Sequence, residues 1–218
     1  MADINIKVLE PATSFALLTL DELKTMLGIA TADTSSDPQL EQMIDWYSAY
    51  VSQVTNRVFA REKVRETWRD LQSRRVFLSH WPVKEADIES VMVGTGVKGV
   101  GGTLLDPANW ELEEASGKLS IFSGKAEAIV VTYTGGFNLP DEAPDDLKNA
   151  AAIMVRKGRT EAQQEATAGI RSISHKDSRV MFFDPNASSG GGSSGGGAGV
   201  ESIRAVHALL YHYSRLEV

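Results

Sequence analysis

Residues 37–71, DPQLEQMIDWYSAYVSQVTNRVFAREKVRETWRDL, contain both periodicities on which the fold depends. Asp37-Pro38 is typical of a helix N-cap followed by a first-turn proline. Apolar residues then recur at helical spacing: Leu40, Met43, Ile44, Tyr47, Val51 and Val54. After about Asn56 the period shortens, and Val64 to Leu71 has the pattern of a β-strand. The stretch predicts a helix that leads into a β-rich segment.

A second helix is predicted upstream and a third downstream. Thr19-Leu20-Asp21-Glu22 fits a capping box, and Gly28 can end the short helix that follows. Pro144-Asp145-Asp146 is typical of a helix start, because carboxylates are favoured at the positive end of the helix dipole. The buried stripes are expected to be Leu20, Leu23, Met26 and Leu27 in the first of these helices, and Leu147, Ala150, Ala151 and Met154 in the other.

Between these helices the sequence consists of short β-type runs separated by Gly, Pro, Asn and Asp. This pattern favours antiparallel strands joined by turns. The expected strands are Val64–Leu71, Val76–Leu78, Ile88–Val93, Trp110–Leu112, Leu119–Ile121 and Ala128–Tyr133.

The predicted fold class is α+β: a small bundle of about four helices with an inserted antiparallel β-rich module, an extended arm and a C-terminal helix. Ser188 to Gly199 is almost wholly Gly and Ser, which predicts a flexible tether. The expected segments are an N-terminal helix pair (1–60), the β-rich insertion (61–138), a third bundle helix (139–168), an arm or hairpin (169–187), the tether (188–199) and a C-terminal helix (200–218).

Composition narrows the function classes. The chain has 218 residues, 22 Lys+Arg and 29 Asp+Glu, a net charge of −7, and no cysteine. The absence of cysteine excludes disulfides and Cys-based metal sites, and the acidic balance argues against a protein that grips nucleic acid over its surface. The N-terminus lacks the pattern of a signal peptide, and no apolar run is long enough to span a membrane, so synthesis in the cytoplasm and no membrane contact are expected.

Basic residues are concentrated in one stretch, between residues 61 and 79; we call this the basic concentration. It consists of Arg61, Lys63, Arg65, Arg69, Arg74 and Arg75. Alternating charges in a strand are usually a solvated face, and a binding stripe is the alternative.

The sequence contains only weak matches to motifs for catalytic, cofactor-binding or metal-binding sites. Gly94-Thr95-Gly96-Val97-Lys98-Gly99 satisfies G-x-G-x-x-G, but the following glycines and Asp106-Pro107 cannot supply the required helix, so a mobile loop is expected. His80, His175, His207 and His212 have no metal-binding spacing. Adjacent carboxylates on a helix point about 100° apart, and those near Pro144 can instead cap a helix N-terminus. We therefore expect no catalytic residue, no cofactor and no metal, and treat an enzyme as the least favoured class.

The order of these landmarks carries more information than any one motif. The opening helix pair (Leu18–Ile29 and Ser36–Arg57) is followed by Trp81-Pro82-Val83, by Val130-Val131-Thr132-Tyr133-Thr134-Gly135-Gly136-Phe137 and by Pro144-Asp145-Asp146-Leu147. In this order, from about Leu18 to Arg159, the chain resembles the head–tail connector (adaptor) proteins of tailed phages. It departs from the smallest members in its long β insertion and its Gly/Ser tether.

The resemblance implies a structural protein of the virion neck that forms a ring of about twelve copies under the portal. The implied partners are the portal protein, neighbouring copies and the next neck or tail protein, while DNA passes through the channel without sequence-specific binding. An alternative is another neck or tail-completion protein that binds the tail rather than the portal.

Aromatic and basic residues near the C-terminus are the expected partner contacts, because such residues are enriched at interface hot spots. In an alternative interpretation, Leu210 and Tyr213 only close the helical core. The expected contacts with the portal or a neighbouring copy are Arg171, His175, Lys176, Arg179, Phe182, Phe183, Arg204, Tyr211, Tyr213 and Arg215.

Overall fold

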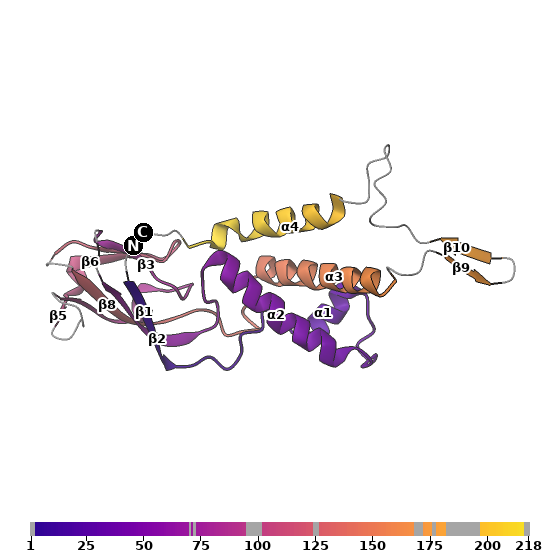
Figure 1. Ribbon diagram of the computed structural model, residues 1–218. Helices are drawn as coiled ribbons and strands as arrows, with labels where there is room; N and C mark the ends of the chain where they lie inside the picture. The colour runs from indigo at the N-terminus through magenta and orange to yellow at the C-terminus, as the bar shows by residue number, and fades with distance from the viewer. Residues whose placement is uncertain are drawn as a thin grey trace.

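The computed structural model describes residues 3–69, 71, 73–94, 102–123, 127–167, 172–175, 178–181 and 197–215. Figure 1 shows a β-rich module at one end, a bundle of helices in the middle, and a small hairpin beyond the far end of α3. The α+β prediction is confirmed, with four α-helices and antiparallel sheets in the described part of the chain.

The bundle consists of α1 (Leu20–Leu27), α2 (Asp37–Thr55), α3 (Asp145–Thr167) and α4 (Gly197–Leu210). The predicted capping box of α1 is confirmed: the Glu22 amide donates to Thr19 Oγ1 at 3.2 Å, and the Thr19 amide donates to Glu22 Oε2 at 2.8 Å. Gly28 ends this helix with a left-handed φ of 71°, which glycine adopts without a Cβ clash.

The start of α2 differs from the prediction. Ser36, not Asp37, is the N-cap, and it makes no side-chain capping bond. Asp37 is the first helical residue, and its carboxylate lies 2.6 Å from the ammonium of Lys24, which is only 1% exposed. A charged pair between α1 and α2 therefore occupies the position where a local cap was expected.

The helical core is formed mainly by small and aliphatic residues. The predicted α3 stripe of Leu147, Ala150, Ala151 and Met154 is buried, as are Leu40, Ile44 and Val51 of α2. Gly158 allows α3 to approach α2, since a Cβ there would collide with the hydroxyl of Tyr47.

The β module is a sandwich of two antiparallel sheets, and a second hydrophobic core lies between them. The larger sheet has the order β1-β2-β8-β4-β5 and the smaller one β3-β7-β6. The strands are β1 (Asp3–Glu10), β2 (Glu62–Arg69), β3 (Arg75–Phe77), β4 (Ile88–Gly94), β5 (Thr103–Leu104), β6 (Trp110–Glu113), β7 (Lys118–Ile121) and β8 (Ala128–Gly135). The 3₁₀ turns η1 (Glu85–Asp87) and η2 (Pro107–Asn109) precede β4 and β6.

All six predicted strands of this module lie where the sequence placed them, but two strands were not predicted. β5 has only two residues, too few for a periodic pattern. β1 precedes the helices in the chain and completes the larger sheet by pairing with β2, from Asp3↔Arg69 to Val8↔Val64. The β module is therefore not built from the 61–138 insertion alone.

The C-terminal part contains the hairpin β9 (Ser172–His175) and β10 (Ser178–Met181), followed by α4 and the 3₁₀ turn η3 (Tyr211–Tyr213). α4 begins at Gly197, within the expected tether. Residues 188–196 of that tether, and Thr95–Gly99 of the glycine motif, lie outside the described residues.

Candidate assembly surfaces and the buried polar cluster

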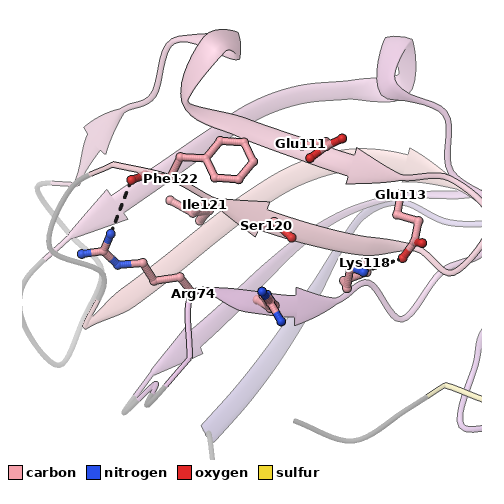
Figure 2. Close-up of a pocket in the computed structure, with 8 residues that line it drawn as sticks. Arg74, Glu111, Glu113, Lys118, Ser120, Ile121 and Phe122 are labelled. Atoms are coloured by element: carbon pink, nitrogen blue, oxygen red, sulfur yellow. Dashed lines mark hydrogen bonds and ion pairs between the residues drawn. The ribbon is translucent and has the colours of Figure 1, made fainter.

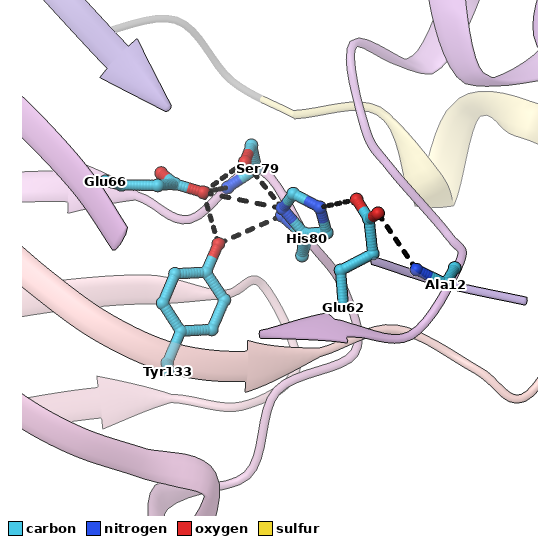
Figure 3. Close-up of polar contacts among 6 residues, drawn as sticks. All are labelled: Ala12, Glu62, Glu66, Ser79, His80 and Tyr133. Atoms are coloured by element: carbon cyan, nitrogen blue, oxygen red, sulfur yellow. Dashed lines mark hydrogen bonds and ion pairs between the residues drawn. The ribbon is translucent and has the colours of Figure 1, made fainter. Parts of the chain in front are cut away.

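A cluster of buried polar side chains lies where the two cores meet (Figure 3). His80 Nε2 is 2.9 Å from Glu62 Oε2, and His80 Nδ1 is 3.0 Å from Ser79 Oγ. Glu66 Oε1 accepts hydrogen bonds from the Ser79 amide at 3.0 Å and from the hydroxyls of Ser79 and Tyr133. The cluster joins β2, β8 and the segment after β3.

The series Ser79–His80–Glu62 has the residue types of a hydrolase triad, but not its accessibility. None of the cluster's side chains is more than 6% exposed, so a substrate cannot reach the Ser79 hydroxyl. Burial, together with the charge of Glu66, raises the pKa of Tyr133, which keeps this phenol protonated as a donor. We assign the cluster a structural role, because every member satisfies another buried polar group.

Arg57 ties the C-terminal segment to both cores. Its guanidinium donates to the carbonyl oxygens of Tyr213 (2.9 Å), Leu78 (3.2 Å) and Ser116 (2.7 Å). Burial, with a smaller effect of the nearby Arg215 charge, lowers the pKa of Arg57 to about 10. The side chain therefore remains charged at neutral pH and holds three separate segments together.

Four of the ten predicted contact residues have described side chains. Arg204 and Tyr211 are exposed on α4 and η3, and Tyr211 is 77% exposed. Tyr213 packs edge-on against Phe59 and Trp81, with ring centroids 6.0 and 5.6 Å apart. Half-buried Arg215 donates its amide to the Thr55 carbonyl at 2.8 Å. The structure thus places Tyr213 and Arg215 against the C-terminal end of α2 and the residues that follow it. Arg204 and Tyr211 face outward.

The other six contact residues belong to the predicted arm. His175 lies in β9 and Arg179 in β10, but their side chains lie outside the described part of the structure. Arg171, Lys176, Phe182 and Phe183 lie outside the described residues altogether.

Two exposed apolar features were missed by the sequence analysis. Trp46 is 61% exposed on the outer face of α2, off the buried stripe of that helix. A large aromatic residue off the apolar period was the signal that could have revealed it. All residues of β1 are exposed, including Ile4, Ile6 and Val8. Their strict alternation with Asp3, Asn5 and Lys7 was visible in the sequence.

The outer face of the smaller sheet is charged and forms a shallow groove of about 600 Å³ (Figure 2). Its two edge strands differ in charge. Arg74 and Arg75 lie at the β3 edge, while Glu111 and Glu113 lie on β6, where Glu113 pairs with Lys118 at 2.7 Å. Phe122, at one end of the groove, is 56% exposed and accepts a hydrogen bond from Arg74 through its carbonyl.

The described part of the chain was found to lack two features that would point to other functions. In it, no group of His, Asp and Glu side chains is arranged to hold a metal ion. No helix within those residues is long and apolar enough to cross a membrane.

Comparison with known proteins gives one family and several structures. The family model "head completion protein" matches residues 16–178, and no curated protein matches the chain. The chain is similar to one in the neck of an empty GTA particle computed with C6 symmetry (15% identity, 98% of this chain and 97% of that chain covered, TM-score 0.51). It is also similar to one in the neck of a native GTA particle computed with C12 symmetry (14%, 98% and 97%, TM-score 0.51). A third similar chain comes from the virion of a native gene transfer agent (GTA) particle (16%, 98% and 96%, TM-score 0.50). At these identities the likeness establishes a shared fold.

Proposed function

Because this chain belongs to the head completion protein family, we propose that it is a structural protein of the virion neck, a head–tail connector that forms a ring under the portal and extends the DNA channel. The observation that carries the proposal is the family match, which spans α1 to α3 of the helical bundle and β2 to β8 of the β module. The GTA chains with the same fold come from particle necks, and one of those necks was computed with C12 symmetry, which supports a ring of twelve copies.

The physical character of the chain agrees with this role. A net charge of −7 suits a channel that DNA must pass through, since acidic walls release no counterions from the phosphates. The triad-like arrangement of Ser79, His80 and Glu62 is sealed inside the fold, which agrees with a structural role for these three residues.

The proposed contact with the portal or a neighbouring copy is the C-terminal part of the chain. On α4 and η3, Arg204, His207 and Tyr211 follow each other at spacings of three and four residues, and all three are exposed. Val206 and Leu210, on the opposite side of α4, are buried in the bundle. One face of this segment therefore docks on its own chain and leaves an Arg- and Tyr-bearing face for a partner.

The experiment is to mix the purified protein with tailless, portal-containing heads and, separately, with free tails, and to image both by negative-stain microscopy. We expect ring density at the portal vertex of the heads and none on the tails. Binding to tails alone would favour the tail-completion alternative. The variant R204E/Y211S should lose head binding, whereas E41R/D45R, which changes exposed charges on α2, should retain it.

A further inference from the structure

Four of the six residues in the basic concentration contact a polar or acidic side chain within the chain. Arg61 lies 3.3 Å from Asp87, Lys63 2.8 Å from Glu89, and Arg69 3.1 Å from Asp3. Arg65 donates to Thr132 Oγ1 at 3.4 Å.

Arg74 and Arg75 differ from the other four. Both are exposed at the β3 edge, and neither has an ion pair with a described residue. Arg74 donates a hydrogen bond to the Phe122 carbonyl at 3.4 Å, but neither Arg74 nor Arg75 has an anionic partner among the described residues. The solvated-face interpretation therefore leaves the charges of this pair unneutralised.

The opposite edge of the same sheet carries the opposite charge. Glu111 and Glu114 are exposed in and beside β6, and neither has an ion pair with a described residue. Glu114 Oε1 accepts a hydrogen bond from the Glu85 amide at 3.0 Å, which leaves its negative charge without a cationic partner. Arg75, Ser120 and Glu111 occupy one cross-strand row, with Ser120 of β7 in the middle. Two interstrand spacings, roughly 10 Å in total, separate β3 from β6, and Arg75 and Glu111 form no ion pair across them within one copy.

An uncovered apolar surface lies beside the basic edge. Ile4, Ile6 and Val8 of β1 stand directly opposite Trp68, Glu66 and Val64 of β2, so they share the core-facing side of the larger sheet. They are nevertheless 40–44% exposed, because the smaller sheet stops short of β1.

The position of β3 relates this apolar surface to the basic edge. Ser79, just after β3, hydrogen-bonds to Glu66 of β2, which places the β3 edge over β2. An element added beside β3 would lie over the exposed residues of β1.

We propose that copies of this chain associate side by side, with Arg74 and Arg75 at the β3 edge of one copy facing Glu111 and Glu114 at the β6 edge of the next. The proposal rests on the proposed ring. β3 and β6 are both antiparallel to β7 and hence parallel to each other, so a neighbour related by rotation about an axis along the strands brings its β6 beside β3 in the same direction. Arg75 and the neighbour's Glu111 then lie about one strand spacing apart, roughly 5 Å.

The occupant of the basic edge is a second copy because both halves of the contact are present on one chain, at opposite edges of one sheet. Unlike edges give a heterologous contact, the kind that closes into rings. An unrelated acidic partner, such as a nucleic acid, would engage Arg74 and Arg75 but would have no use for Glu111 and Glu114. If the partner is a second copy, a charge change at one edge can be compensated by a change at the other edge. If the partner is a nucleic acid, it cannot.

Charge reversal tests this dependence on portal-containing heads. The variant R74E/R75E has two acidic edges, and E111R/E114R has two basic edges. We expect each alone to bind heads in at least tenfold fewer copies than wild type, because like charges then face each other. The variant with all four substitutions, and an equimolar mixture of the two double variants, should recover binding. E41R/D45R, with the same change in net charge as E111R/E114R, should behave as wild type.

Two results would overturn the lateral contact: binding of both double variants at the wild-type level, or loss of binding that neither the fourfold variant nor the mixture restores. Failure of the wild-type protein itself to bind heads would count against the proposed function instead. In that case the lateral contact is still tested by cross-linking of free protein.

The chain has no cysteine, so R75C/E111C introduces the only two thiols. Cα atoms on neighbouring strands are close enough for a disulfide. Under oxidation at high protein concentration we expect a ladder of covalent oligomers from the double variant, and at most dimers from R75C or E111C alone. Dimers only from the double variant, or no cross-linking, would contradict an edge-to-edge contact between unlike edges.

Discussion

At the scale of single residues, Arg57 has a large predicted effect on stability. Arg57→Ala leaves the carbonyls of Tyr213, Leu78 and Ser116 without their donor and should lower the free energy of unfolding by roughly 2–4 kcal/mol. Arg57→Lys should lose an intermediate amount, because one ammonium cannot reach three carbonyls in fork geometry. Urea unfolding measures both variants. A loss below about 0.5 kcal/mol for Arg57→Ala would show that the three bonds contribute little.

Glu22 provides a pH-dependent prediction. Burial tends to raise its pKa, but hydrogen bonds from Lys148 and Thr19 and the charge of Lys148 outweigh this, and the pKa falls below its usual 4.5. A lowered folded-state pKa contributes stability that is present above pH 4.5 and lost as the pH falls through the folded-state value. Glu22→Gln should therefore be less stable than wild type at pH 7, by about 1 kcal/mol for a pair in which Lys148 is buried and Glu22 partly exposed, and equally stable near pH 3. Unfolding curves at the two pH values measure this. A constant difference at both would contradict the ion pair as its cause.

Gly136 and Gly28 form a matched pair of backbone predictions. Both have a left-handed φ, 104° and 71°, but a Cβ at Gly136 would collide with the Ala60 carbonyl, whereas a Cβ at Gly28 meets open space. Gly28→Ala should cost about 1–2 kcal/mol from the φ alone. Gly136→Ala should cost clearly more, because the backbone itself must shift. Thermal unfolding of the two variants compares them, and equal losses would mean that the strand end moves freely.

Local interactions were readable from the sequence, and distant ones were not. The Thr19–Glu22 capping box was predicted in detail because both partners lie within four residues. The Asp37–Lys24 pair and the donation from Arg57 to Tyr213 join segments that only the tertiary fold brings together. For the same reason the basic residues could be counted from the sequence, but which of them were already paired could not be known.

At the scale of elements, helices and inserted strands followed from periodicity, whereas β1 did not. The alternation of Ile4, Ile6 and Val8 with polar residues is a strand signal, but the partner strand β2 lies about 60 residues later, beyond the helix pair. The candidate interface was predictable only in part. Arg204 and Tyr211 are exposed as an interface requires, while Tyr213 packs on the core, an alternative the sequence had left open.

On α4 and the turn that follows it, neighbouring residues have different roles: one packs in the core and the next is available for a partner. Leu210 is 1% exposed and belongs to the helical core, whereas Tyr211 faces outward. Leu210→Ala should lower the free energy of unfolding by roughly 2–5 kcal/mol, and Tyr211→Ala by under about 0.5 kcal/mol. Head binding should show the reverse for the folded proteins at low temperature: retained by Leu210→Ala and weakened by Tyr211→Ala. If Tyr211→Ala unfolded as readily as Leu210→Ala, the exposed Tyr211 side chain would have to contribute to the stability of the fold.

At the scale of the whole molecule, two buried cores joined by the Glu62–Glu66–His80 cluster give a chain that can fold as a single copy. Apart from the exposed apolar residues Ile4, Ile6 and Val8 of β1, the surface left for lateral association is charged. Exposed ion pairs contribute only about 0–1 kcal/mol each and are screened by salt. The fold therefore needs no neighbour, and the proposed ring would have little to hold it together away from a template.

The resulting prediction concerns the state of the free protein. At micromolar concentration and about 0.15 M salt, sedimentation should show a monomer or a weakly associated species, because the loss of translational and rotational freedom outweighs a few screened charge pairs. A portal offers a ring of equal sites, and copies held side by side there gain the lateral contact at high effective concentration. Head binding should accordingly rise steeply with protein concentration, and the bound ring should lose copies together when salt is raised to about 1 M. A tight dodecamer in the absence of portal, unchanged by salt, would show that the ring is held by buried apolar contacts instead of the charged edges.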